Sequence, residues 1–228
     1  LWALSLADPP AWTQLFPSGD PPSERWEHSA IYDPVRERMV VFGGRPVIPP
    51  EVWALSLTGT LAWTQLTSSA STPPGLLLRA DHSAIYDPVR DRMVVYGGVC
   101  SGIGGGCFYQ DVWTLSLADT PAWTELTPAG IPPVWRADHS AVYDPARNRM
   151  VVFGGLSNDC VDPEMVWALN DVWALSWSSI VAVDDPGVQP LVIGLGPPAP
   201  NPTRGATTVS YTLAQAGGVQ LGVYDVSG

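Results

Sequence analysis

The sequence predicts an all-β protein made of several copies of a four-stranded sheet, followed by the start of a second β-domain. Three observations predict this fold class: a long segment recurs three times, short runs are rich in β-branched and aromatic residues, and glycines and prolines separate these runs. Hydrophobic residues make up 46% of the 228 residues and charged residues only 14%. The chain can therefore bury a large apolar core.

The repeat defines the structural unit. Residues 28–44 read HSAIYDPVRERMVVFGG, and nearly the same letters return at residues 82–98 and 139–155. Two shorter segments, VWALS and AWTQL with small changes, follow in the same order. Because a repeat of this length is one supersecondary unit, each copy predicts one sheet, which we call a blade.

Each blade is expected to contain four strands. HSAIYD favours extended backbone and ends in a turn at Asp33 and Pro34. RMVVFGG is apolar on both alternating faces, as in a strand covered on both sides, and its paired glycines suit a turn where no side chain fits. VWALSL is again apolar, whereas AWTQL is shorter and more polar, as an outer strand should be. A sheet with two apolar faces must stack against neighbours, which is the β-propeller arrangement.

These motifs resemble the kelch family, whose repeat is about 50 residues long. The family's strand ending in two glycines, followed by spaced tryptophans, and the arginine ahead of the first strand both have counterparts here. The resemblance implies a kelch β-propeller over residues 1–177, with a half blade at 1–15 and blades at about 24–66, 79–126 and 136–177. It assigns architectural roles to His28, His82, His139, Gly43, Gly44, Gly97, Gly98, Gly154, Gly155, Trp53, Trp113 and Trp173.

The pattern is incomplete at both ends. Residues 1–15 supply only a third and a fourth strand, and no AWT-x-L segment follows Trp177, although residues 178–185 could replace it. About four blades are visible, fewer than closed kelch propellers usually have. We therefore expect a partial propeller whose remaining blades lie upstream.

A different composition begins after the last blade. Residues 178–202 are proline-rich and predict an extended linker. Residues 203–228 predict two alternating strands, 207–213 and 219–225, joined at a glycine pair. Their sequence pattern resembles that of the FlgD-like immunoglobulin domain and of the carboxy-terminal sorting domain of type IX secretion. This resemblance implies a truncated β-sandwich-like segment, use of bacterial secretion machinery, and an extracellular or cell-surface location.

The charge composition excludes some partners. The net charge is −11, and all 11 basic residues are arginines without a basic run. An acidic protein of this kind is a poor partner for nucleic acid or anionic membrane. No apolar stretch approaches the roughly 18 residues of a membrane span.

The loops on one face of the propeller are where recognition is expected. They comprise residues 16–24, 67–78 and 127–135 between blades, and residues 45–50, 99–110 and 156–170 between second and third strands. The last three lengthen along the chain, and length variation on a rigid scaffold is typical of binding loops. Aromatic faces suit sugar rings or apolar side chains, and arginine forks suit carboxylates. The candidate ligand-binding residues are Arg25, Trp26, Arg79, Phe108, Tyr109, Trp135, Arg136 and Trp167; alternatively, the aromatic ones pack against adjacent blades.

Other reactive side chains have simpler interpretations. The three histidines occupy equivalent repeat positions, which favours hydrogen bonds between blades over a metal site. Asp159, Asp162 and Glu164 form a weak calcium candidate, because their oxygens suit the ion but their spacing fits no EF-hand. Cys100 and Cys107 flank a glycine-rich loop and are a candidate disulfide, which leaves Cys160 without an assigned partner.

No catalytic motif is present, and no cofactor is expected. Nucleophile-elbow, P-loop, HExxH and zinc-type cysteine patterns are all absent. The leading hypothesis is a secreted or cell-surface propeller that binds a protein or a glycan. The alternatives are a fragment of a galactose-oxidase-like copper enzyme, whose catalytic residues lie outside this chain, and an adhesin or spacer arm without a ligand site.

Overall fold

The computed structural model describes residues 1–46, 51–67, 71–100, 108–158 and 166–177, together with two short strands further along. The chain divides into two compact units. The first contains Leu1–Pro128 and Pro133–Trp177, and the second contains Ala129–Pro132 and Ser178–Gly228.

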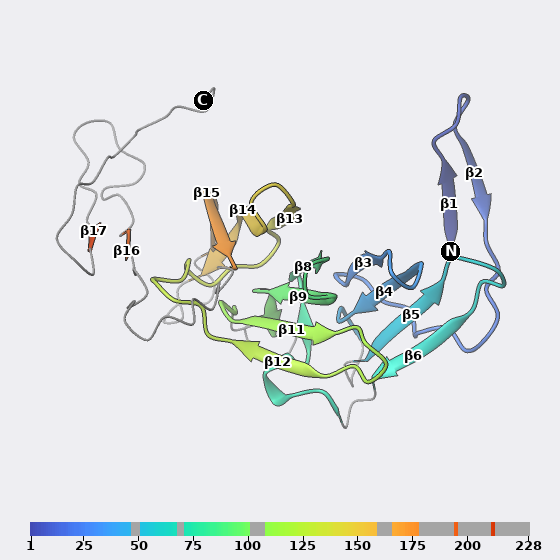
Figure 1. Ribbon diagram of the computed structural model, residues 1–228, viewed down its shortest axis with the longest axis horizontal. Helices are drawn as coiled ribbons and strands as arrows, with labels where there is room; N and C mark the ends of the chain where they lie inside the picture. Colours follow the sequence, from blue (N-terminus) through green and yellow to red (C-terminus); the bar gives the residue numbers. More distant parts are fainter. Residues whose placement is uncertain are drawn as a thin grey trace, which may run out of the picture. The chain divides into compact units, whose positions relative to one another are not determined.

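The first unit consists of antiparallel sheets whose strands follow chain order (Figure 1). A two-stranded hairpin is formed by β1 (Trp2–Ser5) and β2 (Ala11–Gln14). The first blade contains β3 (Ser29–Asp33), β4 (Arg38–Phe42), β5 (Val52–Ser56) and β6 (Trp63–Thr67). The second contains β8 (Ser83–Asp87), β9 (Arg92–Tyr96), β11 (Val112–Ser116) and β12 (Trp123–Leu126). The third contains β13 (Ser140–Asp144), β14 (Arg149–Asn158) and β15 (Val166–Ser176). The predicted fold class, all-β with repeated antiparallel blades, is confirmed.

Register and turn chemistry repeat from blade to blade. Ile31 pairs with Val40 in the first blade, just as Ile85 pairs with Val94 in the second. The aspartate that ends the first strand closes the following turn. Asp33 Oδ1 accepts hydrogen bonds from the backbone N–H groups of Val35 and Arg36, at 3.1 Å each. This is the Asx-turn chemistry expected of an Asp-Pro sequence.

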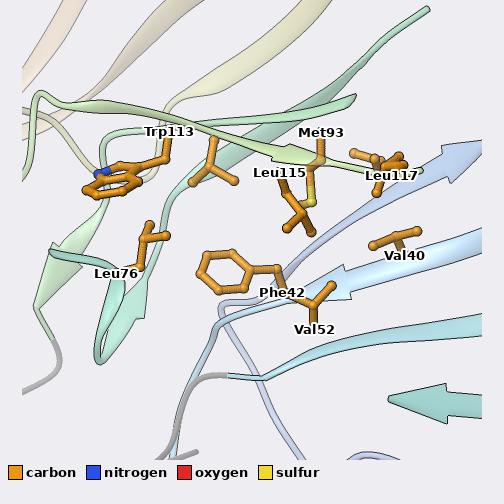
Figure 2. Packing of buried hydrophobic residues seen from close by; sticks show 10 residues of the cluster. Val40, Phe42, Val52, Leu76, Met93, Trp113, Leu115 and Leu117 are labelled. Carbon is orange, nitrogen blue, oxygen red and sulfur yellow. The ribbon is translucent and has the colours of Figure 1, made fainter. Parts of the chain in front are cut away.

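The core lies between neighbouring blades rather than inside one sheet. Phe42 and Val52 of the first blade pack against Met93 and Leu115 of the second, as Figure 2 shows. Leu76, in the single-turn 3₁₀ helix η2 (Pro74–Leu76), belongs to the same cluster. Each fully buried apolar side chain of this size contributes about 1.5–3 kcal/mol, so a blade gains its stability by stacking. A second cluster joins the second and third blades in the same way.

The third blade differs from the expectation of a long loop over residues 156–170. Strands β14 and β15 continue into this region, where Leu156 pairs with Ala168 and Ser157 pairs with Trp167. A β-bulge between Phe153 and Gly155 lets the two strands regain pairing after the glycine turn. Residues 159–165, which come between the two strands in the sequence, lie outside the described residues.

Apart from Ala129–Pro132, the second unit is described only at the paired strands β16 (Gly194–Leu195) and β17 (Tyr211–Thr212). Most of the predicted linker and tail domain, including the strand predicted at 219–225, lies outside the described residues. Within the described part, no helix has the length and apolar character that a membrane crossing requires.

Candidate binding face

At one end of the blades lie the segments that precede each first strand and the segments that follow each second strand. Isolated bridges join Trp26 to Arg45 and Ala137 to Leu156, and the short pair β7 (Arg79–Ala80) and β10 (Val99–Cys100) does the same in the second blade. We call this end the loop face. Equivalent segments therefore build it in every blade.

Ser18, in the segment 16–24, departs from the place expected for this segment on the loop face. Ser18 pairs with Ala62, just before β6 begins, and so lies at the opposite end of the first blade. A depression of about 410 Å³ beside it is lined by residues that include Phe16, Pro21 and Trp63.

Buried arginines hold the loop face together from inside. Arg79 donates to both carboxylate oxygens of Asp111 at 2.7 Å, and Trp113 Nε1 donates to the same carboxylate at 2.7 Å. Arg79 also donates to the carbonyl oxygens of Gly97 and Gly75 at 2.7 and 2.6 Å. We call this arrangement the arginine clamp.

The third blade contains a second arginine clamp. Arg136 binds Asp171 at 2.8 and 3.0 Å, and Trp173 Nε1 donates to Asp171 at 2.6 Å. Arg79 and Arg136 are both fully buried. These two candidates therefore do not reach a ligand at the surface. In the first blade Arg25 is half-buried and donates to Gly43 O at 3.3 Å, while Trp53 Nε1 donates to Glu51.

The aromatic candidates divide by exposure. Trp26 and Trp167 are exposed, the latter on the extended part of β15. Phe108, Tyr109 and Trp135 are half-buried. Tyr109 lies against the Arg79 guanidinium, 4.0 Å from Cζ to the ring centre, and Trp135 Nε1 donates to Asn158 O at 2.9 Å. Among these candidates, Trp26 and Trp167 are therefore the two that present an aromatic face to solvent.

Two histidines connect successive blades. His82 Nε2 lies 2.7 Å from Ser29 Oγ, and His139 Nε2 lies 2.7 Å from Ser83 Oγ. Burial, with a contribution from nearby Arg79, lowers the pKa of His82 to about 3. Burial and Arg136 lower the pKa of His139 to about 4. Both imidazoles are therefore neutral at pH 7, and each bridges two blades.

The residue before each of the three repeat histidines, His28, His82 and His139, was missed by sequence reasoning. Glu27, Asp81 and Asp138 all adopt left-handed backbone, with φ of 59°, 55° and 56°. Asp81 N donates to Glu27 O and Asp138 N to Asp81 O, at 3.1 and 3.0 Å, so a backbone ladder crosses the blades. The recurring acid-His-Ser sequence was the available signal. Arg45 forms ion pairs with Glu27 at 2.5 Å and with Asp81 at 3.6 Å.

This ladder brings two carboxyl groups together. Asp81 is hydrogen-bonded to Asp138, and burial, followed by the charges of Asp138 and Glu27, raises the pKa of Asp81 to about 7 despite the opposing charge of Arg45. The folded protein therefore holds a proton between pH 3.8 and about 7 that the unfolded chain releases. Its stabilising contribution is present at low pH and is lost as the pH rises through 7.

Asp138→Asn is expected to weaken this dependence, because burial and the charge of Glu27 still act on Asp81. Asparagine tolerates left-handed backbone, and without the neighbouring charge Asp81 should ionise at lower pH. The unfolding free energy of the variant minus that of the wild type should rise by about 1 kcal/mol between pH 5 and pH 8, after allowance for solvent screening. Urea unfolding at the two pH values measures it. The histidines contribute equally in both proteins, so their effect cancels in the difference between the two unfolding free energies. If that difference is the same at pH 5 and pH 8, Asp138 does not raise the pKa of Asp81.

The remaining candidates are only partly described. Among the described residues Cys100 forms no disulfide, and its expected partner Cys107 lies outside them, so this pair stays a prediction. Asp159, Asp162 and Glu164, the calcium candidates, also lie outside them. Among the residues that are described, no three histidine, cysteine or carboxylate side chains are grouped as a metal would require. Cys100 is hydrogen-bonded to Tyr109. Burial, followed by the neighbouring Cys100, raises the pKa of Tyr109 to about 12.

Taken together, the stacked blades, their arginine clamps and their histidine bridges define a β-propeller repeat protein. The model of the KLHDC2/KLHL20/DRC7 kelch-repeats domain matches residues 1–176 and 47–210. The chain belongs to the kelch-repeat family.

Curated relatives share about a third of the aligned residues. Host cell factor 1 of Rattus norvegicus is 32% identical over 216 residues, covering 89% of this chain and 10% of that protein. Host cell factor homolog hcf-1 of Caenorhabditis elegans is 32% identical over 168 residues, which is 63% of this chain and 20% of that protein. Multiple epidermal growth factor-like domains protein 8 of Rattus norvegicus is 33% identical over 151 residues, which is 63% of this chain and 5% of that protein. The chain thus spans a fifth or less of the length of these relatives.

Proposed function

We propose that this kelch domain is a scaffold that binds another protein through its loop face. The observation that carries the proposal is the exposure of Trp26 and Trp167 on an end of the blades that buried arginine clamps make rigid. Large aromatic side chains on a preorganised surface are the usual anchors of protein interfaces. The net charge of −11 favours a partner segment that combines basic side chains with apolar ones.

Trp167→Ala is expected to weaken binding of a basic, aromatic-containing peptide selected on a peptide array by about tenfold or more. Fluorescence anisotropy with the labelled peptide measures the dissociation constant. Trp12→Ala is the matched control, because Trp12 is also exposed but lies on the β1–β2 hairpin. Equal losses in both variants would contradict a site on the loop face.

A glycan ligand would use the same aromatic faces. The same variants on a glycan array separate the two ligand classes: capture of an oligosaccharide that Trp167→Ala abolishes, with no peptide captured, replaces the protein ligand by a glycan. If neither array yields a ligand, the spacer or adhesin-arm function takes its place.

We further propose that the domain acts outside a bacterial cell and is exported through the type IX machinery. The support is the resemblance of residues 203–228 to FlgD-like and sorting domains, which rests on sequence alone. Fractionation of a host that has this secretion system, with and without residues 203–228 on the chain, tests the location. Equal retention of both forms inside the cell would contradict it.

A further inference from the structure

The two histidines that connect successive blades each use only one ring nitrogen. His82 Nε2 lies 2.7 Å from Ser29 Oγ, and His139 Nε2 lies 2.7 Å from Ser83 Oγ. The two histidines are only 7% and 8% exposed. In the part of the chain that the structure describes, the buried Nδ1 atom of each ring has no hydrogen-bond partner. We call each of these contacts, between a histidine and the serine of the preceding blade, a histidine bridge.

The unbonded nitrogen indicates which tautomer each ring adopts. A neutral imidazole has one N–H donor and one acceptor nitrogen, and a serine hydroxyl can bond either of them. Buried N–H groups without an acceptor are very rare in proteins, whereas acceptors with an unused lone pair are less so. The geometry therefore favours a proton on Nε2, which donates to the serine oxygen, and a bare acceptor at Nδ1.

Aromatic rings of the preceding blade cover both histidines. The ring of His82 lies 5.2 Å from that of Phe42, and the ring of His139 lies 5.1 Å from that of Tyr96. A second proton on either histidine would therefore stand on Nδ1 in surroundings that supply neither water nor an acceptor. Such burial disfavours the charged form of an imidazole.

The charges near the two rings also oppose a second proton. Arg79, His139 and His28 act on His82, in decreasing order, and Arg136 acts on His139. Burial is the larger cause in both cases, and together these causes lower the pKa of His82 to about 3 and that of His139 to about 4.

The nearby carboxylates are engaged elsewhere. Asp111 and Asp171 bind the two clamp arginines. Asp81 and Asp138, which precede the two histidines in the sequence, are hydrogen-bonded to each other. Within the described segments none of these carboxylates bonds Nδ1 of either ring. No acceptor is therefore in place for a protonated histidine.

The histidine bridges lie against the glycine pairs from which the loop-face segments start. A Cβ added to Gly43 would stand 2.6 Å from His82 Cε1, so the ring and this glycine are in close contact. The next residue, Gly44, donates its N–H across the same junction to Arg79 O at 3.0 Å. The second junction repeats both contacts. A histidine ring that leaves its place therefore frees the segment that begins at the glycine pair.

We propose that the histidine bridges make the junctions between blades acid-sensitive, so that protonation of the rings opens a junction and releases its loop-face segment. An open junction lets water reach the ring, which then binds a proton at its ordinary pKa of 6.5. Each junction is therefore most stable above pH 6.5 and weakens as the pH falls below it. The device does not depend on which ligand the loop face binds.

Nitrogen-15 NMR of the whole chain, labelled at histidine, tests the tautomer and the titration. At pH 7 both bridging rings should carry a proton on Nε2 and none on Nδ1, and neither should titrate above about pH 5 in the folded protein. His28 is the internal control, because it occupies the same repeat position but is exposed, and it should titrate at higher pH than the other two. A bridging ring with its proton on Nδ1, or one that titrates near pH 6.5, would overturn the proposal.

His82→Gln tests the effect on stability. Glutamine keeps an N–H donor for Ser29 Oγ but does not titrate. The unfolding equilibrium constant of the wild type, divided by that of the variant, should increase about 30-fold between pH 7.5 and pH 5 in urea denaturation. Asp81 gains stability over part of this range, but it is present in both proteins and cancels. His28→Gln is the matched control and should change the ratio much less.

Hydrogen exchange locates the opening. After correction for the intrinsic effect of pH, exchange of the Gly44 amide should speed up on acidification in the wild type but not in His82→Gln. No acceleration in the wild type would show that acid does not open the junction locally. Equal responses of the two glutamine variants in the urea experiment would show that the buried ring does not sense acid. Should His82→Gln fail to fold, the NMR titration of the wild type decides on its own.

Discussion

Asp111→Asn is expected to lower the free energy of unfolding by about 3–5 kcal/mol, as measured by urea denaturation at pH 7. The reason is the burial of its partner: Arg79 is fully buried and cannot lose its charge, so removal of the carboxylate leaves a desolvated cation. Trp113 Nε1 also loses its charged acceptor. A domain of this size has only about 5–15 kcal/mol to lose, so the variant should approach unfolding at moderate temperature.

An exposed ion pair of the same chemistry provides the control. Arg147 binds Asp144 at 3.3 Å with most of its side chain in solvent, and Arg147→Met should cost less than about 1 kcal/mol. A loss below about 1 kcal/mol for Asp111→Asn would show that water reaches Arg79 and that the clamp is not a closed structural element.

Gly98→Ala is the second change with a large expected effect, a loss of about 3 kcal/mol or more. Gly98 has φ of +97°, and an added Cβ would stand 2.5 Å from Ala80 O and 2.8 Å from His82 Cβ. Both neighbours belong to the segment that enters the second blade, and Gly98 N donates to Arg136 O of the third blade at 2.8 Å. Neither side can move away without breaking a junction, so steric repulsion adds to the left-handed backbone strain.

Gly130→Ala separates these two contributions. Its φ of +91° is close to that of Gly98, but nothing lies within 4 Å of the added Cβ. It should therefore show only the cost of the backbone conformation, about 1–2 kcal/mol. Thermal unfolding of both variants measures the difference, and equal losses would refute the close approach at Gly98.

The repeat was sufficient to predict the blades, because each copy contains the same strand segments, the same turn residues and the same pair of glycines. The HSAIYD strand, the Asp-Pro turn and the glycine pair lie where the periodicity placed them. The extension of β14 and β15 was not predictable in this way. It depends on a bulge after Phe153 and on pairing across a segment that has no counterpart in the other blades.

Candidate residues were harder to predict than strands. An arginine before each blade suggested an exposed fork for carboxylate ligands, but Arg79 and Arg136 face inward, where Asp111 and Asp171 supply the carboxylates. Sequence alone gives the side chain's chemistry but not the direction in which it points. The acid-Val-Trp sequence in the third strand region of each blade did contain the partner, since Asp111 and Asp171 accept hydrogen bonds from the arginine and from Trp113 and Trp173.

The ladder through Glu27, Asp81 and Asp138 has a consequence for how such a chain diversifies. Its bonds join backbone N–H to backbone carbonyl, so the link between blades places no demand on side-chain identity beyond tolerance of the left-handed conformation. A gene duplication that adds one blade brings a complete donor and a complete acceptor with it, and a deletion removes both together. Blade number can therefore change by whole units while the spacing between neighbours is inherited intact, and the surface side chains of each new blade are left to diverge.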